Sequence, residues 1–410
     1  MAGELLDRAF NYAVELLKEL ISIPTVSPAG DNYDKAANLL ARELEKLGFS
    51  VKVVEVDRDY QKRECKTASD KPRYIVIGRL GDKGKVVHVN GHYDVVPGGP
   101  GWTVTEPFKP VVKEGRLYGR GAIDMKGGIT AAIAGIKLAL DSGYYPKDKI
   151  IEMAFVPDEE IGGKCGTGYL VEKVLKKTPE YVIIPEPSGL EAPWHGHKGA
   201  LWAEIRVYGK TAHASTPWKG VNAFTAGARL ALELERAYSV LLSNRRTNYK
   251  ITPPDAVYST FMLGGVAGVP QGKTNQVPGE FRFTIDRRLI PEETVESAKA
   301  ELEGLVKWVS TGLGILSYSI TYKEEMPPVV SEPGELYEAL RRAALKVGVE
   351  VKEPELCPGG LDLRYYVEKG SKALSYGPKG DTAHAPDEFI ELDELKKLVQ
   401  IFANLYMERL

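Results

Sequence analysis

Histidines and acidic residues occur in short clusters that are far apart in the sequence but together contain the ligands of two adjacent metal ions. In chain order the cluster members are His92, Asp94, Asp124, Glu159, Glu160, Glu186 and His384. Imidazoles and carboxylates without thiolates suit catalytic zinc, cobalt or manganese. Two such ions about 3.5 to 4 Å apart can activate a water for hydrolysis of an amide. The residue types therefore indicate two-metal hydrolytic chemistry.

Each cluster also has a purely structural interpretation. An aspartate before an apolar helix, such as Asp124, is commonly an N-cap, and consecutive acids such as Glu159 and Glu160 are typical of a polar turn. Two features favour chemistry. His92 and Asp94 are two residues apart at the end of an extended run, so both can face one side and the carboxylate can orient the imidazole. The glutamate pair follows a buried strand, where one carboxylate can bind metal and the other can move protons.

The elements that must position these residues alternate between strands and helices. Strands are expected at 51–56, 74–78, 85–90, 149–156 and 181–184, and helices at 5–21, 34–47 and 127–140. The strands are nearly continuous apolar runs, which predicts an α/β domain with a mostly parallel mixed sheet flanked by helices. His92, Glu160 and Glu186 follow strands, where open α/β sheets place their ligand crevice.

The pattern changes after residue 198. The elements expected there are a strand at 201–208, a helix at 222–239, strands at 256–263 and 279–287, a helix at 292–309 and a strand at 316–322. This βαββαβ order is that of a ferredoxin-like α+β unit. Because a helix resumes at 335–346, we expect an inserted domain at 199–323. The 410 residues exceed one core, and residues 1–198 and 324–410 would form a discontinuous catalytic domain.

Composition excludes several classes of partner. Lys plus Arg (54) nearly balances Asp plus Glu (56) without a long basic stripe, which argues against nucleic acid. No apolar stretch is long enough to span a membrane. The cysteines, Cys65, Cys165 and Cys357, are odd in number and widely spaced, so we expect neither a disulfide framework nor a thiolate zinc site. A reducing compartment, and hence a cytoplasmic location, is the expectation.

The motifs resemble, in order, those of the dinuclear zinc amidohydrolase and metallopeptidase superfamily, which contains acetylornithine deacetylase, succinyl-diaminopimelate desuccinylase, aminoacylase and glutamate carboxypeptidase. They are Gly-His-Tyr-Asp-Val-Val-Pro at 91–97, Gly-Arg-Gly with Asp-Met-Lys-Gly at 119–127, Asp-Glu-Glu-Ile-Gly-Gly at 158–163, Pro-Glu-Pro-Ser at 185–188, and His384 with Asp387-Glu388. The similarity extends from about residue 16 to the end.

The resemblance implies a role for each residue. His92 and Glu186 would bind one divalent ion, Glu160 and His384 the other, and Asp124 would bridge them. The ions would be zinc, with cobalt or manganese as substitutes. Glu159 would be the general base. It would take a proton from the water that bridges the two metals and later pass that proton to the leaving amine. Asp94 would orient His92. The inserted domain would mediate homodimerisation, and His213 would reach the partner's active site to stabilise the oxyanion; a surface histidine is the alternative.

Other positions resemble substrate-binding positions of the superfamily. They are Asn275, Arg287, Arg288, Gly360 and Arg364. Arginine suits a substrate carboxylate because its planar fork binds both oxygens. The sequence departs from the pattern at Leu361, where a hydroxyl residue is common, and at Pro185, where glycine is usual. These departures leave the substrate open.

The function implied is a cytoplasmic, homodimeric two-metal hydrolase that cleaves the amide of an N-acyl amino acid, as acetylornithine deacetylase or succinyl-diaminopimelate desuccinylase does. A dipeptidase or carboxypeptidase with the same metal centre is the first alternative, since the metals would not distinguish the two. An inactive, metal-bearing binding or regulatory relative is the second. Such a relative is expected to lack a ligand or the base, and here Glu159 and all the ligand positions are filled.

Overall fold

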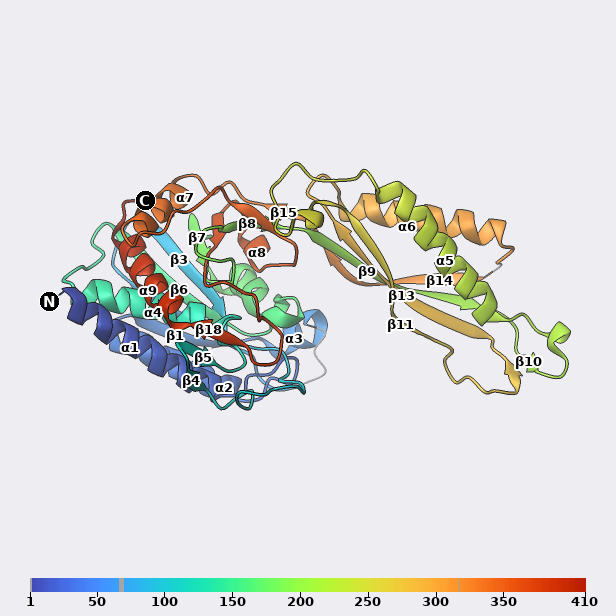
Figure 1. The fold of residues 1–410 in the computed structure, drawn as a ribbon, viewed down its shortest axis with the longest axis horizontal. Coiled ribbons are helices and arrows are strands. Elements are labelled where there is room, and N and C mark those ends of the chain that lie inside the picture. The colour runs from blue at the N-terminus through green and yellow to red at the C-terminus, as the bar shows by residue number, and fades with distance from the viewer. Residues whose placement is uncertain (1, 66–69, 316) are drawn as a thin grey trace. The chain divides into compact units, whose positions relative to one another are not determined.

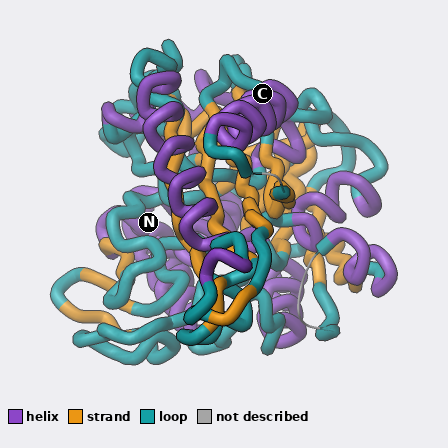
Figure 2. Tube along the Cα trace, turned by 90° about the vertical axis from the view of Figure 1, so that its right-hand side faces the viewer, coloured by secondary structure: helices purple, strands orange, loops and turns teal. Residues whose placement is uncertain are grey.

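The chain divides into two units (Figure 1). Unit 1 contains Met1–His195, Ser331–Glu355 and Leu361–Leu410, and unit 2 contains Gly196–Val330 and Leu356–Gly360. This computed structural model describes residues 2–65, 70–315 and 317–410. The insertion expected at 199–323 lies within unit 2. Figure 2 distinguishes the helices from the strands along the same trace.

Unit 1 is built on a mixed sheet. Its strands, in spatial order, are β1 (Ser50–Glu55), β2 (Tyr74–Leu80), β6 (Lys149–Val156), β3 (Lys85–His92), β7 (Tyr181–Ile184), β17 (Lys372–Ser375) and β8 (Trp194–His197). Neighbours from β6 to β17 are parallel, and the outer pairs are antiparallel. The prediction of a mixed α/β sheet is confirmed. Strands β6, β3 and β7 end at one edge, and this edge receives the candidate site.

Helices cover both faces of this sheet. Successive residues of β2 belong to different apolar clusters: Val76 lies in the larger cluster and Ile75 in a smaller one. Because successive side chains of a strand point to opposite faces, the two clusters are on opposite faces of the sheet. The larger cluster receives α1 (Ala2–Ile21), α2 (Tyr33–Lys46), α4 (Lys126–Asp141), α7 (Glu335–Leu345) and α9 (Leu392–Met407). The smaller receives α3 (Arg58–Glu64) and the short helices η2 (Lys164–Gly168) and η3 (Leu170–Val174).

Short elements complete the description of unit 1 and of the segments at its boundary. They are β4 (Val111–Lys113), β5 (Arg116–Tyr118), η1 (Glu159–Ile161), α8 (Leu363–Val367), β18 (Phe389–Glu391), β15 (Val329–Val330) and β16 (Glu355–Cys357). Strands β18, β5 and β4 form a separate small sheet.

Unit 2 has the predicted βαββαβ order. Its elements are β9 (Gly199–Tyr208), α5 (Ala223–Leu242), β11 (Thr260–Gly268), β13 (Glu280–Leu289), α6 (Val295–Gly312) and β14 (Tyr318–Met326), with short β10 (Ala212–His213), η4 (Pro217–Lys219), η5 (Pro254–Val257) and β12 (Gln276–Val277). The antiparallel sheet has the order β11-β13-β9-β14. The strand predicted at 256–263 begins at Thr260, because Pro254 starts a helical turn instead. Residue 316, the first of another predicted strand, lies outside the described residues.

The expectation that the cysteines form no disulfide is wrong. Cys65 and Cys165 are joined, with their Cα atoms 5.5 Å apart. Both belong to the smaller apolar cluster, where the end of α3 meets η2, although 100 residues separate them in sequence. Sequence spacing does not reveal this proximity. The cysteine-based reason for expecting a reducing compartment is therefore removed.

A further expectation concerned membranes. Within the part of the chain that the structure describes, no helix is both long enough and apolar enough to cross one.

Candidate metal centre

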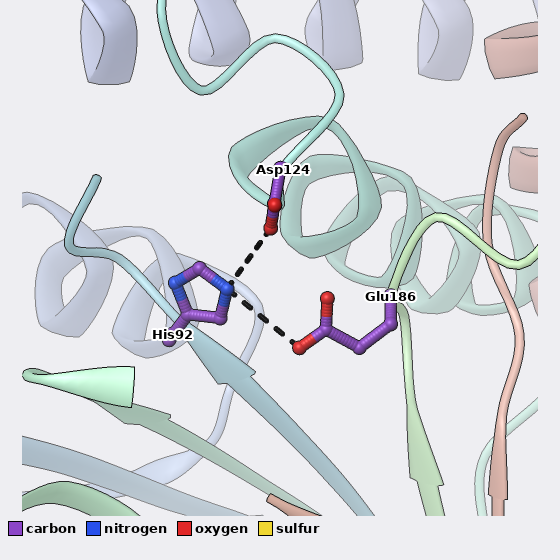
Figure 3. Close-up of side chains that lie close together, drawn as sticks. All are labelled: His92, Asp124 and Glu186. Atoms are coloured by element: carbon purple, nitrogen blue, oxygen red, sulfur yellow. Dashed lines mark hydrogen bonds and ion pairs between the residues drawn. The ribbon is translucent and has the colours of Figure 1, made fainter. Parts of the chain in front are cut away.

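The predicted ligands form two groups that share one aspartate. His92, Asp124 and Glu186 make the first group (Figure 3), and Asp124, Glu160 and His384 make the second. Within each group the potential ligand atoms all lie within 4.8 Å of one another. Asp124 belongs to both groups, and its Oδ1 faces His92 while its Oδ2 faces His384.

Strand ends and one helix start bring these residues together. His92 is the last residue of β3, Glu186 lies just after β7, and Asp124 lies just before α4. Glu160 follows β6 in the turn η1. His384, in the segment before β18, has a φ of 64°, a left-handed conformation that non-glycine residues rarely adopt. The site therefore draws on the first and the last of the three sequence segments of unit 1.

The geometry of both groups fits a cation. His92 Nε2 lies 3.2 Å from Asp124 Oδ1 and 3.6 Å from Glu186 Oε1. His384 Nε2 lies 3.2 Å from Asp124 Oδ2 and 3.0 Å from Glu160 Oε2. In each group a single imidazole nitrogen faces two carboxylates. In addition, Glu186 Oε1 is buried without a hydrogen-bond partner. A metal ion would satisfy these converging donors, which are those preferred by zinc and similar ions.

The electrostatics of the site also favour bound cations. Burial, reinforced by the charge of Asp124, raises the pKa of Glu160 to about 7. Burial raises the pKa of Glu186 to about 8, although His92 opposes this shift. Hydrogen bonds to Asp124 and Glu160 raise the pKa of His384 to about 10. Bound cations would stabilise the ionised carboxylates and the neutral imidazoles that serve as ligands.

Glu159 belongs to neither ligand group. Its side chain is half-buried, and burial together with the charge of Asp362 raises the pKa of its carboxyl group well above the ordinary value. The following turn is tight: a Cβ on Gly163 would come within 2.2 Å of Asp362 Oδ1, and the φ of Gly163 is +67°. A carboxyl group with a raised pKa beside a candidate metal centre is suited to moving protons.

Asp94 contacts both parts of the site. His92 Nδ1 lies 3.0 Å from the main-chain oxygen of Asp94 and 3.5 Å from its Oδ1. The Asp94 carboxylate accepts the backbone N–H groups of Glu159 at 3.1 Å and Glu160 at 3.3 Å. Asp94 thus orients the glutamate turn as well as the imidazole.

The remaining predicted residues are not brought together with these groups by any described contact. Asn275 and His213 are exposed in unit 2, where the main-chain oxygen of Asn275 accepts the N–H of Ala214 at 2.9 Å. Arg287 is buried and paired with Glu293. Arg288 lies 2.9 Å from Asp286, and Gly360 is half-buried.

Arg364, in unit 1, is buried and already has partners. Its Nη1 donates to the main-chain oxygen of Leu361 at 2.9 Å and its Nη2 to that of Gly162 at 2.7 Å.

Two residues that contact or lie near the candidate site were not assigned from sequence. Glu388 is fully buried, and its Oε1 accepts the N–H groups of Gly121, Ile123 and Asp124 at 2.9 to 3.2 Å. Asp362 is the buried acid near Glu159. Glu388 could have been found from its place in the motif that begins at His384, whereas Asp362 gave only the signal of an acid in a glycine-rich loop.

Comparison with known proteins identifies relatives that cover almost all of the chain. A model described as peptidase family M20/M25/M40 matches residues 88–408. An uncharacterized metallohydrolase of Methanocaldococcus jannaschii is 28% identical, covering 96% of this chain and 98% of the relative. A succinyl-diaminopimelate desuccinylase of Psychromonas ingrahamii is also 28% identical, covering 96% and 97%.

Solved structures share the fold. An M20 family metallo-carboxypeptidase from Sulfolobus solfataricus has a TM-score of 0.73 at 23% identity, covering 96% of this chain and 98% of that one. A Bacillus subtilis protein described as a dinuclear metal binding peptidase of the M20 family has a TM-score of 0.68 at 16% identity, covering 98% of each chain.

Proposed function

The chain belongs to peptidase family M20/M25/M40 and is a metal-dependent hydrolase of amide bonds, and we propose that its substrate is an N-acyl amino acid. The observation that carries the reaction class is the pair of ligand groups that share Asp124. The support for the substrate class is the desuccinylase relative, similar over 96% of this chain. The second candidate is a carboxypeptidase or dipeptidase, favoured by the likeness to the Sulfolobus enzyme.

We assign the metal-binding residues from the two groups. His92 and Glu186 would hold one ion, Glu160 and His384 the other, and Asp124 both. Zinc fits this donor set, with cobalt or manganese as substitutes. When bound, two such ions supply an acidified water and a polarised carbonyl group.

Glu159 is the proposed general base. Its raised pKa suits a group that accepts a proton from water and later donates it to the leaving amine. The Asp94 carboxylate accepts the backbone N–H of Glu159 and so fixes the backbone from which the Glu159 side chain extends. Since Glu159 is absent from both ligand groups, its loss should affect proton transfer and not metal binding.

The test is Glu159→Gln in the metal-loaded protein, assayed with acetyl amino acids, succinyl amino acids and dipeptides. We expect kcat to fall about 10²- to 10⁴-fold with unchanged metal content. The control is Glu191→Gln, an exposed glutamate paired with Lys352, which should retain activity. Undiminished activity in Glu159→Gln would remove this residue from the mechanism. Hydrolysis of dipeptides alone would favour the second candidate.

We further propose that two copies of the chain associate through unit 2. Helix α5 exposes Leu232 and Val240, at 64% and 74% of their surfaces, and the edge strand β11 exposes Met262 and Val266. Exposed apolar side chains on one unit are typical of a protein interface. Sedimentation velocity should detect dissociation of Val240→Asp but not of Val112→Asp, an exposed valine of unit 1. Unchanged association of Val240→Asp would contradict this interface.

His213 is the proposed oxyanion donor to the partner's site. The backbone N–H of Ser215 donates to His213 Nδ1 at 3.1 Å, so the neutral imidazole carries its proton on Nε2 and can donate it. His213→Ala and Glu159→Ala chains should each be inactive, and mixing them should restore activity. In a mixed dimer, the site of the His213→Ala chain keeps its own Glu159 and receives His213 from the other chain. A mixture without activity would exclude the contribution across subunits.

A further inference from the structure

Asp158 starts the turn that carries Glu159 and Glu160, and it does so in a conformation that costs energy. Its φ is 63°, in the left-handed region that side chains other than glycine rarely adopt. Its main-chain oxygen accepts the N–H of Gly163 at 2.8 Å and closes the turn. Such strain persists only where surrounding contacts hold the residue in place. The side chain of Asp158, which is 1% exposed, makes those contacts.

Two buried residues donate hydrogen bonds to the Asp158 carboxylate. Tyr33 Oη donates to Oδ1 at 2.8 Å, and Arg73 Nε donates to Oδ2 at 2.8 Å. Arg73 is fully buried, and its other nitrogens donate to the main-chain oxygens of Lys71 at 2.8 Å and Pro28 at 2.6 Å. All three guanidinium nitrogens are therefore bonded, and the planar group cannot turn without breaking several contacts. We call Tyr33, Arg73 and Asp158 the clamp.

The clamp also contacts the strand end that carries His92. The rings of Tyr33 and Tyr93 meet edge to face with centroids 5.3 Å apart, and Tyr93 lies between His92 and Asp94 in the sequence. The guanidinium carbon of Arg73 lies 5.4 Å from the centroid of the Tyr33 ring. One rigid buried assembly thus joins the end of β3 to the turn after β6.

We propose that Tyr33 and Arg73 are positioning residues for amide hydrolysis, which act through Asp158 to fix Glu159 relative to the metal ligands. This proposal rests on the proposed function, in which Glu159 is the general base. Neither Tyr33 nor Arg73 belongs to a ligand group. Their effect is geometric, because a displacement of about 1 Å of a reacting group can cost about 10²-fold in rate.

The first test is Tyr33→Phe, which removes one hydrogen bond and keeps the ring that contacts Tyr93. With the metal-loaded protein we expect kcat to fall about tenfold or more, KM to change less than about twofold, and metal content to stay constant. The matched control is Tyr406→Phe, another buried tyrosine, whose hydroxyl donates to the main-chain oxygen of Ala132 at 3.1 Å. It should keep the kcat of the parent even if it loses similar stability.

A double-variant cycle separates positioning from general loss of stability. If the clamp acts through Glu159, Tyr33→Phe will not lower further the residual rate of Glu159→Gln. Asp158→Asn, which keeps the shape of the side chain, gives a second variant in case Tyr33→Phe does not fold. Either variant retaining the kcat of Tyr406→Phe, or losses that multiply with Glu159→Gln, would overturn the proposal. A fully active Glu159→Gln would instead contradict the assignment of the base.

Discussion

The Asp94 carboxylate accepts the backbone N–H of Glu160 at 3.3 Å, although 66 residues separate the two in sequence. The same carboxylate accepts the N–H of Glu159 and lies 3.5 Å from His92 Nδ1. One side chain thus links a residue of each ligand group to the proposed base. The two ligand groups and Glu159 are therefore mechanically connected, which makes Asp94 a sensitive position for substitution.

The first prediction concerns this connection. Asp94→Asn replaces one acceptor oxygen by an amide nitrogen, so one of the backbone N–H groups of Glu159 and Glu160 loses its partner. We expect metal affinity to fall about 10- to 100-fold, as for other residues that orient metal ligands. Titration with zinc would measure it. Asp57→Asn, at the exposed N-cap of α3, is the control and should bind zinc normally. Equal affinities in the two variants would contradict the role of Asp94.

The second prediction concerns Glu388, which holds the backbone before Asp124. Arg120 Nη1 donates to Glu388 Oε2 at 2.5 Å, and both side chains are almost completely buried. Glu388→Gln would place an amide nitrogen against the guanidinium and leave a buried charge unpaired. We expect the free energy of unfolding to fall by about 3 to 5 kcal/mol, measured by urea denaturation.

The control for Glu388 is Glu391→Gln, which breaks the exposed pair with Arg116 at 2.8 Å. Exposed ion pairs contribute little to stability, so the urea midpoint should hardly change. A loss of similar size in both variants would mean that burial of the Arg120 pair has no special effect.

Local patterns in the sequence predicted the mixed α/β sheet and placed the candidate ligands His92 and Glu186 at one of its edges. This succeeded because strand ends in an α/β sheet meet at a common edge, so His92 and Glu186 could be placed without any knowledge of contacts. Patterns along the chain say nothing about which distant side chain a buried polar group chooses. Arg287 was expected among the residues that could bind a substrate carboxylate, and in the structure its guanidinium pairs with Glu293.

The disulfide illustrates the same limit. The sequence gives no signal that Cys65 and Cys165 meet, because their proximity depends on how α3 packs on the segment after the glutamate turn. The clamp residues Tyr33 and Arg73 were missed for the same reason, since their partner Asp158 is 125 and 85 residues away. Tertiary packing decides such pairs.

The third prediction follows from the disulfide. A bond that closes a loop of this length, 100 residues, stabilises the folded chain by about 4 to 5 kcal/mol in the chain-entropy model. Dithiothreitol should therefore lower the Tm of the parent protein. It should leave the Tm of the double variant Cys65→Ala/Cys165→Ala unchanged, since the remaining cysteine, Cys357, is not part of this disulfide. Thiol titration of the denatured, unreduced protein should find that thiol alone; three reactive thiols would contradict the bond.

The fourth prediction concerns pH and Lys198. Burial, reinforced by the charges of Arg288 and Arg287, lowers the pKa of Lys198 to about 8, against about 10.4 for an unperturbed lysine. Below pH 8 both folded and unfolded chains hold the proton, so the folded state bears the full cost of burying the charge. Between about pH 8 and 10.4 the unfolded chain binds more protons, and the stability contribution therefore rises with pH.

Urea unfolding of the parent and of Lys198→Met at pH values from about 7.5 to 10.5 would detect this contribution. The stability of the parent relative to the variant should increase across the range, because only the parent loses the cost of the buried charge. Substitution also removes the bonds from Nζ to the main-chain oxygens of Ala256 and Tyr258, at 3.1 and 2.5 Å, so the slope with pH is the informative quantity and not the stability at one pH. Lys219→Met, at an exposed position of the same unit, is the control and should parallel the parent. A Lys198→Met slope equal to that of the parent would show that folding does not lower the pKa of Lys198.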